Sequence, residues 1–210
     1  MLAELAGASL VTEHRPGRFV MHDLVRDYAA GHARQDVGEA GIREAIGRGM
    51  DHYLHTPLDA GTIWFQGPQL FPVAPPAPGV IPEHLADETG VLQWTRAEHQ
   101  VLLQATFQAA AAGLLTRAWQ LFAFLAFVLG GQGFWADWRA AGQAVLGAAE
   151  VAGDHVALGW THAMLGWYGM FTGAQHEDRG HLAQAPDHFR RAGDLNGQAR
   201  TQFFASMLDG

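Results

Sequence analysis

Histidine is the residue type whose number and spacing first suggest chemistry in this chain. Twelve histidines occur among 210 residues, and an imidazole can bind a metal ion or exchange a proton near neutral pH. His52 and His55 are three residues apart and share one helix face. His176 and His181 are five residues apart with Gly180 between them, whereas a zinc-binding metalloprotease helix has histidines at i and i+4. We therefore expect solvated histidines and no metal site.

The composition excludes catalysis by cysteine or lysine. The chain has no cysteine, which excludes disulfides, thiolate catalysis and Cys-ligated zinc. It also has no lysine, which excludes a P-loop lysine, a Schiff base and a Ser-Lys pair. The sequence Gly130-Gly131-Gln132-Gly133 lacks the Lys-Ser/Thr of a phosphate loop and is expected to be a turn between helices. We expect a binding protein and not an enzyme.

Charge and hydropathy argue against two classes of partner. The formal net charge is −8, and residues 13–34 carry four arginines against three acidic residues, too little positive charge for direct nucleic-acid binding. The longest apolar run, residues 118–131, includes Gln120 and is shorter than the ~20 residues that span a bilayer. No secretory signal is recognisable. We expect a cytoplasmic location without membrane contact.

The prolines divide the chain into three segments. Residues 1–56 show helical patterns around two short apolar runs that flank His14-Arg15-Pro16-Gly17, a pattern typical of a β-hairpin. Residues 57–82 hold seven of the nine prolines and are predicted to be a linker or long loop. Aromatic side chains of that segment are expected to pack on a neighbouring element; they are Trp64, Phe65 and Phe71.

The third segment, residues 83–210, is predicted to be helical throughout. A Ser/Thr-x-x-Glu pattern at Thr95 and Glu98 predicts a helix start at Thr95. The helices are expected at residues 95–112, 115–130, 134–152, 155–172, 180–192 and 195–208. The dipeptide Ala-Gly recurs at 112–113, 152–153 and 192–193, and Asp follows at 154 and 194. A 40-residue period with two helices per unit predicts an α-solenoid of helix hairpins.

Several motifs together resemble a family of signalling ATPases. Residues 21–26, Met-His-Asp-Leu-Val-Arg, resemble the motif near the end of the winged-helix domain of the NB-ARC (STAND) class. Residues 92–103 and 134–138 are similar to the helical region that follows in bacterial members, and the 40-residue repeats to their tetratricopeptide tails. Among these proteins the closest likeness is to SARP-type transcriptional regulators. Residues 165–168, Leu-Gly-Trp-Tyr, depart from the tetratricopeptide consensus by one position.

The resemblance implies a domain order and a function. Residues 1–56 would be part of a winged helix, 57–82 a linker, and 83–210 a tetratricopeptide-like repeat domain. The chain would be the sensor and interaction tail of a regulator, and its ATPase core would lie upstream. His22, supported by Asp23, would contact the β-phosphate of ADP, so ADP or ATP would bind only when the upstream domain is present.

The repeats imply a protein or peptide partner, or the ATPase core itself. Trp135, Trp138 and Trp167 are the candidates for lining its groove. A stand-alone helical scaffold without any nucleotide-linked role is the alternative, and the two differ in whether the gene encodes a P-loop upstream of residue 1.

Overall fold

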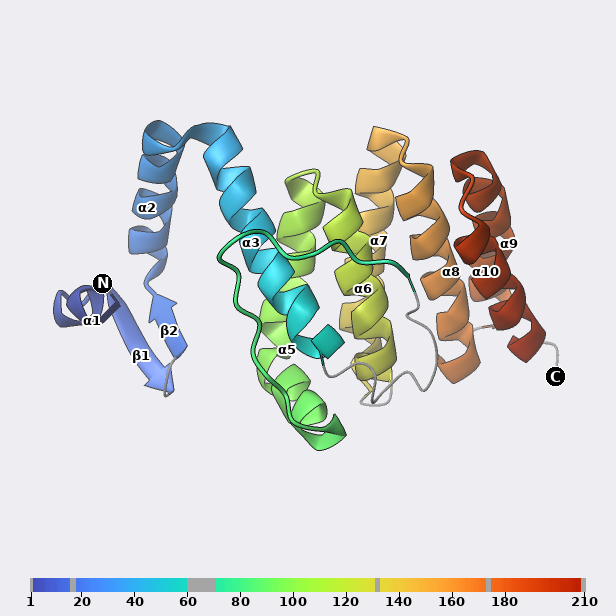
Figure 1. Cartoon of the computed structure of the whole chain (residues 1–210), viewed down its shortest axis with the longest axis horizontal. Helices are drawn as coiled ribbons and strands as arrows, with labels where there is room; N and C mark the ends of the chain where they lie inside the picture. The colour runs from blue at the N-terminus through green and yellow to red at the C-terminus, as the bar shows by residue number, and fades with distance from the viewer. Residues whose placement is uncertain (1, 16–17, 60–70, 131–132, 173–174, 209–210) are drawn as a thin grey trace. The chain divides into compact units, whose positions relative to one another are not determined.

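A computed structural model of the chain describes residues 2–15, 18–59, 71–130, 133–172 and 175–208 (Figure 1). Most of these residues are helical, and the strands among them form an antiparallel two-stranded sheet. The prediction of a mostly α-helical chain is therefore confirmed. The backbone divides into two compact units, residues 1–45 and 46–210, which are described separately.

The first unit is built around a β-hairpin. Helix α1 (Leu2–Gly7) precedes strands β1 (Val11–Arg15) and β2 (Arg18–Met21), and helix α2 (Asp23–Asp36) follows. Val11 pairs with Met21 in the antiparallel ladder, which confirms the predicted hairpin. Helix α2 buries none of its side chains, and Leu24 and Tyr28 are 75% and 69% exposed.

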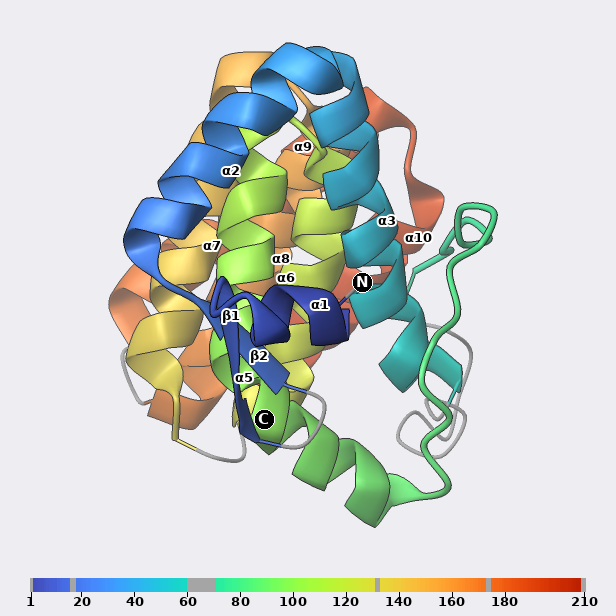
Figure 2. The same ribbon diagram turned by 90° about the vertical axis from the view of Figure 1, so that its left-hand side faces the viewer.

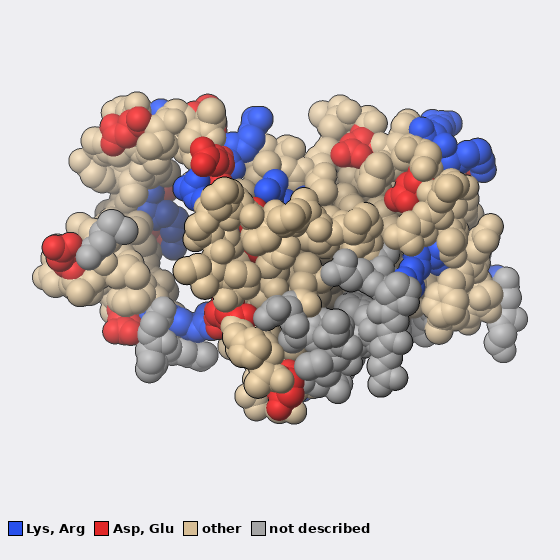
Figure 3. All heavy atoms as spheres, in the orientation of Figure 1, with Lys and Arg blue, Asp and Glu red and all other residues tan. Residues whose placement is uncertain are grey.

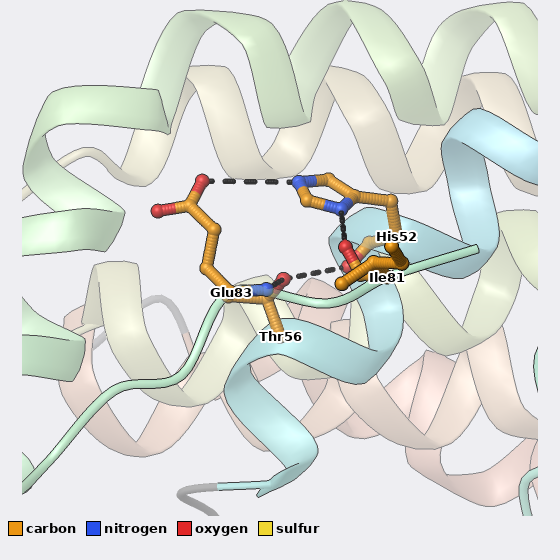
Figure 4. A network of polar contacts seen from close by, with 4 residues as sticks. All are labelled: His52, Thr56, Ile81 and Glu83. Carbon is orange, nitrogen blue, oxygen red and sulfur yellow. Dashed lines mark hydrogen bonds and ion pairs between the residues drawn. The ribbon is translucent and has the colours of Figure 1, made fainter. Parts of the chain in front are cut away.

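Helix α3 (Gly38–Asp59) continues through Pro57, beyond the predicted end of the first segment. The Pro-rich segment after it, where described at residues 71–87, is irregular and hydrogen-bonded to α3. Thr56 Oγ1 accepts from the Glu83 N–H at 3.0 Å, and His52 Nδ1 lies 2.9 Å from the Ile81 carbonyl (Figure 4). His52 Nε2 lies 3.8 Å from the Glu83 carboxylate. These bonds fix the segment along the helix.

The aromatic residues of the Pro-rich segment were predicted to pack on a neighbour. Phe71 confirms this, because it is 5% exposed and lies edge-on to Trp119 and Trp160. Trp64 and Phe65 lie outside the described residues.

The rest of the second unit is a succession of helices, whose bounds are α5 (Glu88–Ala111), α6 (Leu115–Gly130), α7 (Trp135–Ala152), α8 (His155–Thr172), α9 (Gln175–Ala192) and α10 (Leu195–Leu208). Each contacts the next, and contacts also join α5 to α7, α6 to α8, and α8 to α10. The axes of α6, α7, α8 and α9 are roughly aligned with one another in both views (Figures 1 and 2). Helix α9 begins five residues before its predicted start, so Gly180 lies inside a helix and not in a turn.

The corners after α5, α7 and α9 share one geometry. Each has a glycine with positive φ, namely Gly113 at 70°, Gly153 at 66° and Gly193 at 70°. In each corner the residue after the glycine donates its N–H to the carbonyl five positions back, on Ala109, Ala149 or Phe189, at 2.9–3.1 Å. This left-handed helix termination favours glycine because a Cβ is strained there. The predicted helix ends at a 40-residue spacing are confirmed.

The helices that follow the second and third of these corners, α8 and α10, each begin after a capping aspartate, as predicted. Asp154 Oδ1 accepts from the Ala157 N–H at 3.0 Å, and Asp194 Oδ1 accepts from the Gly197 N–H at 2.9 Å. A capping side chain satisfies one of the backbone donors that the first turn of a helix leaves without a partner.

The predicted helix start at Thr95 is wrong. Helix α5 begins at Glu88, where Asp87 Oδ1 accepts from the Gly90 N–H at 2.8 Å. Thr95 lies two turns further on, is fully buried, and donates its hydroxyl to the Val91 carbonyl at 2.8 Å. Because a mid-helix threonine can satisfy its hydroxyl on the preceding turn, the Thr-x-x-Glu pattern does not mark a helix N-terminus here.

Aromatic rings from distant parts of the sequence meet in the core of the second unit. Trp119 of α6 stacks on Trp160 of α8, with ring centroids 5.2 Å apart and planes within 2°. Phe189 of α9 lies edge-on to Trp160 at 5.4 Å. These rings, with Phe71, join three helices and the Pro-rich segment.

None of the helices in the described part of the chain combines the length and apolar character that a membrane crossing requires.

Candidate functional site

His22 lies at the junction between the hairpin and helix α2. Its backbone is extended, with φ −61° and ψ 143°, and its Nδ1 accepts from the Leu24 N–H at 3.3 Å. His22 is therefore the N-cap of α2. Because Nδ1 acts as acceptor, the proton of a neutral imidazole resides on Nε2. An exposed Nε2–H at the positive end of a helix is a suitable donor to an anion.

Asp23 takes part in a small polar network beside His22. Its carboxylate lies 3.2 Å from Arg26 Nη1, and Arg26 Nη2 donates to the Met21 carbonyl at 3.2 Å. The Arg26 and Asp23 side chains are 64% and 85% exposed, so the ion pair contributes little stability. What the network does is tie the last residue of β2 to the first turn of α2.

The three candidate tryptophans differ in burial and in the rings that they contact. Trp138 of α7 is 2% exposed and stacks on Phe122 of α6 at 5.0 Å, so it belongs to the core. Trp135, one turn earlier, is half-buried against that core. Trp167 of α8 is also half-buried and stacks on Phe204 of α10 at 5.7 Å. Trp135 and Trp167 are therefore the two that retain surface for a partner.

A groove of about 340 Å³ runs between α9 and α10. Its lining is mostly apolar, with Leu182 and Pro186 from α9 and Ala205 from α10, and it also includes Arg179. The sequence patterns did not single out this groove. A signal was nevertheless present, because Ala205 is 40 residues after Leu165, which is only 2% exposed in α8. The position that is buried in α8 thus lines a groove 40 residues later, in α10.

Acidic and basic side chains are interspersed on the face shown in Figure 3. Ion pairs also form between near neighbours in sequence, such as Arg190 with Asp187 at 2.8 Å and Arg34 with Glu39 at 3.9 Å. Mixed charge of this kind suits contact with a protein surface better than contact with a phosphate backbone.

Comparison with known proteins found a relative that aligns with nearly the whole chain. The chain is similar to a regulatory protein. The relative is the regulatory protein AfsR of Streptomyces griseus, which is 32% identical over 209 residues, 96% of this chain. The aligned region is 21% of AfsR, so the chain spans about a fifth of that relative's length. No family model matches the sequence, and no solved structure matches it.

Proposed function

We propose that this chain is the sensor and interaction region of a multidomain signalling regulator of the NB-ARC (STAND) class, SARP type. The observation that carries the proposal is its similarity, over nearly its whole length, to a regulatory protein about five times as long. The motif at residues 21–26 and the 40-residue repeat support the same class, because each lies where the proposed domain order requires it.

In this proposal, residues 1–56 are the end of a winged helix and His22 is a nucleotide sensor. Support comes from the N-cap geometry, which places the proton of the neutral His22 ring on Nε2 and exposes it. Asp23 and Arg26 hold the junction in place. ADP or ATP would bind only with an upstream ATPase domain. His22 would then donate a hydrogen bond to the β-phosphate of the ADP bound in the closed state.

Residues 83–210 are, in the same proposal, a tetratricopeptide-like α-solenoid that binds a protein or peptide, or the ATPase core. The three corners of one geometry support a repeat architecture. Gly166, in the stretch that resembles the tetratricopeptide Leu-Gly, lies against the backbone of Leu182, as a glycine between tightly packed helices would. The chain acts by binding and carries no catalysis of its own.

The genomic frame upstream of residue 1 tests the nucleotide-linked part. An uninterrupted frame that encodes a Gly-rich Lys-Ser/Thr loop and an acidic strand is the expected result. In that longer protein, His22→Ala should weaken ADP retention measured by chromatography of the extracted nucleotide. An in-frame stop codon and a ribosome-binding site ahead of residue 1 would contradict it and leave the stand-alone scaffold.

Partner binding is tested on the repeats. Purified chain, immobilised, is expected to retain a protein from extracts of the cell that encodes it. Trp135→Ala should reduce this retention at least tenfold, whereas Val151→Ser, a change on the same helix at a residue that is 92% exposed, should not. Equal retention by wild type and Trp135→Ala would show that Trp135 is not part of the interface. No retention by wild type would contradict partner binding.

A further inference from the structure

Four histidines line the contact between helices α8 and α9. His155 and His162 are seven residues apart on α8, and His181 and His188 are seven residues apart on α9. Residues at this spacing share a helix face. The two pairs face one another in antiparallel order, His155 with His188 and His162 with His181. We call these residues the histidine ladder.

The ladder is held together by contacts between imidazoles. Nδ1 of His155 lies 3.1 Å from Nδ1 of His188, and Nδ1 of His162 lies 2.9 Å from Nδ1 of His181. The rings of His162 and His188 stack with centroids 5.4 Å apart and planes within 8°. Each Nδ1–Nδ1 bond needs one nitrogen as donor and the other as acceptor. If both rings are protonated, two donors and two positive charges face each other.

The surroundings favour the neutral state at the centre of the ladder. His162 is 4% exposed, and burial, then the neighbouring His181 and His188, lower its pKa to about 4. The pKa of His188 is also lowered, by burial and then by His155 and Arg191; Asp187 of α9 and Glu150 of α7 oppose this shift. Positive charge at the centre of the ladder is therefore disfavoured.

The preceding helix pair shows what the same positions hold without a ladder. Residues 115–152, which form α6 and α7, contain no histidine. Forty residues before His162 stands Phe122, stacked on Trp138, and forty before His155 stands Leu115. In that pair these two positions hold apolar side chains that cannot be protonated. The chain thus carries two helix pairs at one period, of which only the pair α8–α9 is expected to respond to acid.

We infer that the histidine ladder is an acid-sensitive clamp, which holds α9 on α8 while its rings share protons and releases α9 when they are all protonated. Leu182, next to His181, lies against Gly166 of α8 and also lines the groove between α9 and α10. Release of α9 therefore reshapes that groove. The inference does not depend on the proposed regulator role.

The size of the acid effect follows from proton linkage. An opened state in which His162 has its ordinary pKa binds a proton that the closed state excludes, so opening becomes more favourable as pH falls below about 6.5. One histidine with pKa about 4 when closed makes opening about tenfold more favourable at pH 5.5 than at pH 7.5.

Hydrogen exchange of the full chain, read by mass spectrometry at both pH values and corrected for intrinsic rates, tests the clamp. Protection of residues 155–192 should fall about tenfold at pH 5.5, while residues 115–152 should change less than twofold. An equal response of both helix pairs, or none, would overturn the inference.

Two substitutions install the residues of the preceding pair, His155→Leu and His162→Phe. His162→Phe should remove most of the acid response of residues 155–192 and His155→Leu should reduce it, whereas His32→Gln, at an exposed position in the first unit, should preserve it. A retained response in both ladder variants would count against the clamp. If the variants do not fold, nitrogen NMR of the wild-type imidazoles decides: His162 should stay neutral well below pH 6, and titration near pH 6.5 would refute the inference.

Discussion

The carboxylate of Asp51 is held between Arg117 and the Pro-rich segment. Arg117 Nε lies 2.6 Å from Asp51 Oδ1, and Oδ2 accepts from the Ala77 N–H at 2.9 Å. The Asp51 side chain is 5% exposed. Burial raises its pKa, but the hydrogen bonds from Arg117 and Ala77 and the positive charges of Arg117 and His55 together outweigh burial and lower it below the ordinary value of 3.8. One carboxylate thus joins α3, α6 and a loop that lies 26 residues away in sequence.

Replacing Arg117 with Ala should destabilise the second unit, because it leaves a buried carboxylate without its cation. We expect a loss of about 2 kcal/mol in urea unfolding, less than for a fully buried pair because the Arg117 side chain is 35% exposed. Asp51→Asn in the Arg117→Ala background should recover part of the loss. If Arg117→Ala costs less than ~0.5 kcal/mol, the pair is no stronger than a surface ion pair.

The same pair predicts how stability depends on pH at the acid end. Because the folded-state pKa of Asp51 is lowered below 3.8, its stabilisation is present above that value and is lost as pH falls through the folded-state pKa. Urea midpoints measured from pH 5 to pH 2.5 should fall more steeply for wild type than for Asp51→Asn. Parallel curves would show that Asp51 is not the group responsible.

Gly166 and Gly147 are a matched pair for testing how closely α8 and α9 pack. A Cβ on Gly166 would lie 2.7 Å from the backbone nitrogen of Leu182, whereas a Cβ on Gly147 of α7 would meet nothing within 4 Å. Gly147→Ala should raise stability by up to ~1 kcal/mol through helix propensity. Gly166→Ala should lower it by ~1–3 kcal/mol, because a backbone atom cannot move aside as a side chain can. Thermal melts that shift in the same direction for both variants would contradict the close packing.

Asp194 does more than Asp154, although both cap a helix at the same point of the repeat. Besides accepting from Gly197, Asp194 accepts from Trp160 Nε1 at 3.1 Å, and Trp160 is 1% exposed. Asp154→Ala should cost about 1 kcal/mol, the usual value of a lost cap. Asp194→Ala should cost ~2–3 kcal/mol, because it also leaves a buried indole N–H without an acceptor. If Asp194→Ala in a Trp160→Phe background costs no more than Asp154→Ala, that bond is the source of the difference.

The sequence predicted the features that short local signals determine. Ala-Gly and Ala-Gly-Asp located helix ends within a residue or two, since the left-handed turn at Gly153 and the cap at Asp154 involve neighbours only. Thr95 shows the limit of such signals, because the same four-residue pattern fits a cap and a mid-helix hydroxyl. How the second unit is tied together was not predictable, because Asp51 and Arg117 are 66 residues apart.

The histidine ladder was predictable in part: its spacing within each helix is local, but the pairing between the helices is not. The seven-residue spacing of His155 and His162, and of His181 and His188, was present in the sequence. The predicted helices 155–172 and 180–192 contain all four of these histidines. Which histidine faces which depends on how far α9 slides along α8. That register is set by side chains such as Leu182 against Gly166, and spacing within one helix does not encode it.

Trp135 and Trp138 lie one helical turn apart in α7, but Trp138 is a core residue and Trp135 is partly exposed. Trp138 is 2% exposed and stacked on Phe122, so Trp138→Ala should cost ~3–5 kcal/mol in urea unfolding. Trp138→Phe, which keeps a ring on Phe122, should cost much less. Trp135 is half-buried, and Trp135→Ala should cost about 1 kcal/mol. A loss of stability for Trp135→Ala as large as for Trp138→Ala would make Trp135 a core residue, and its removal would then reveal nothing about a partner.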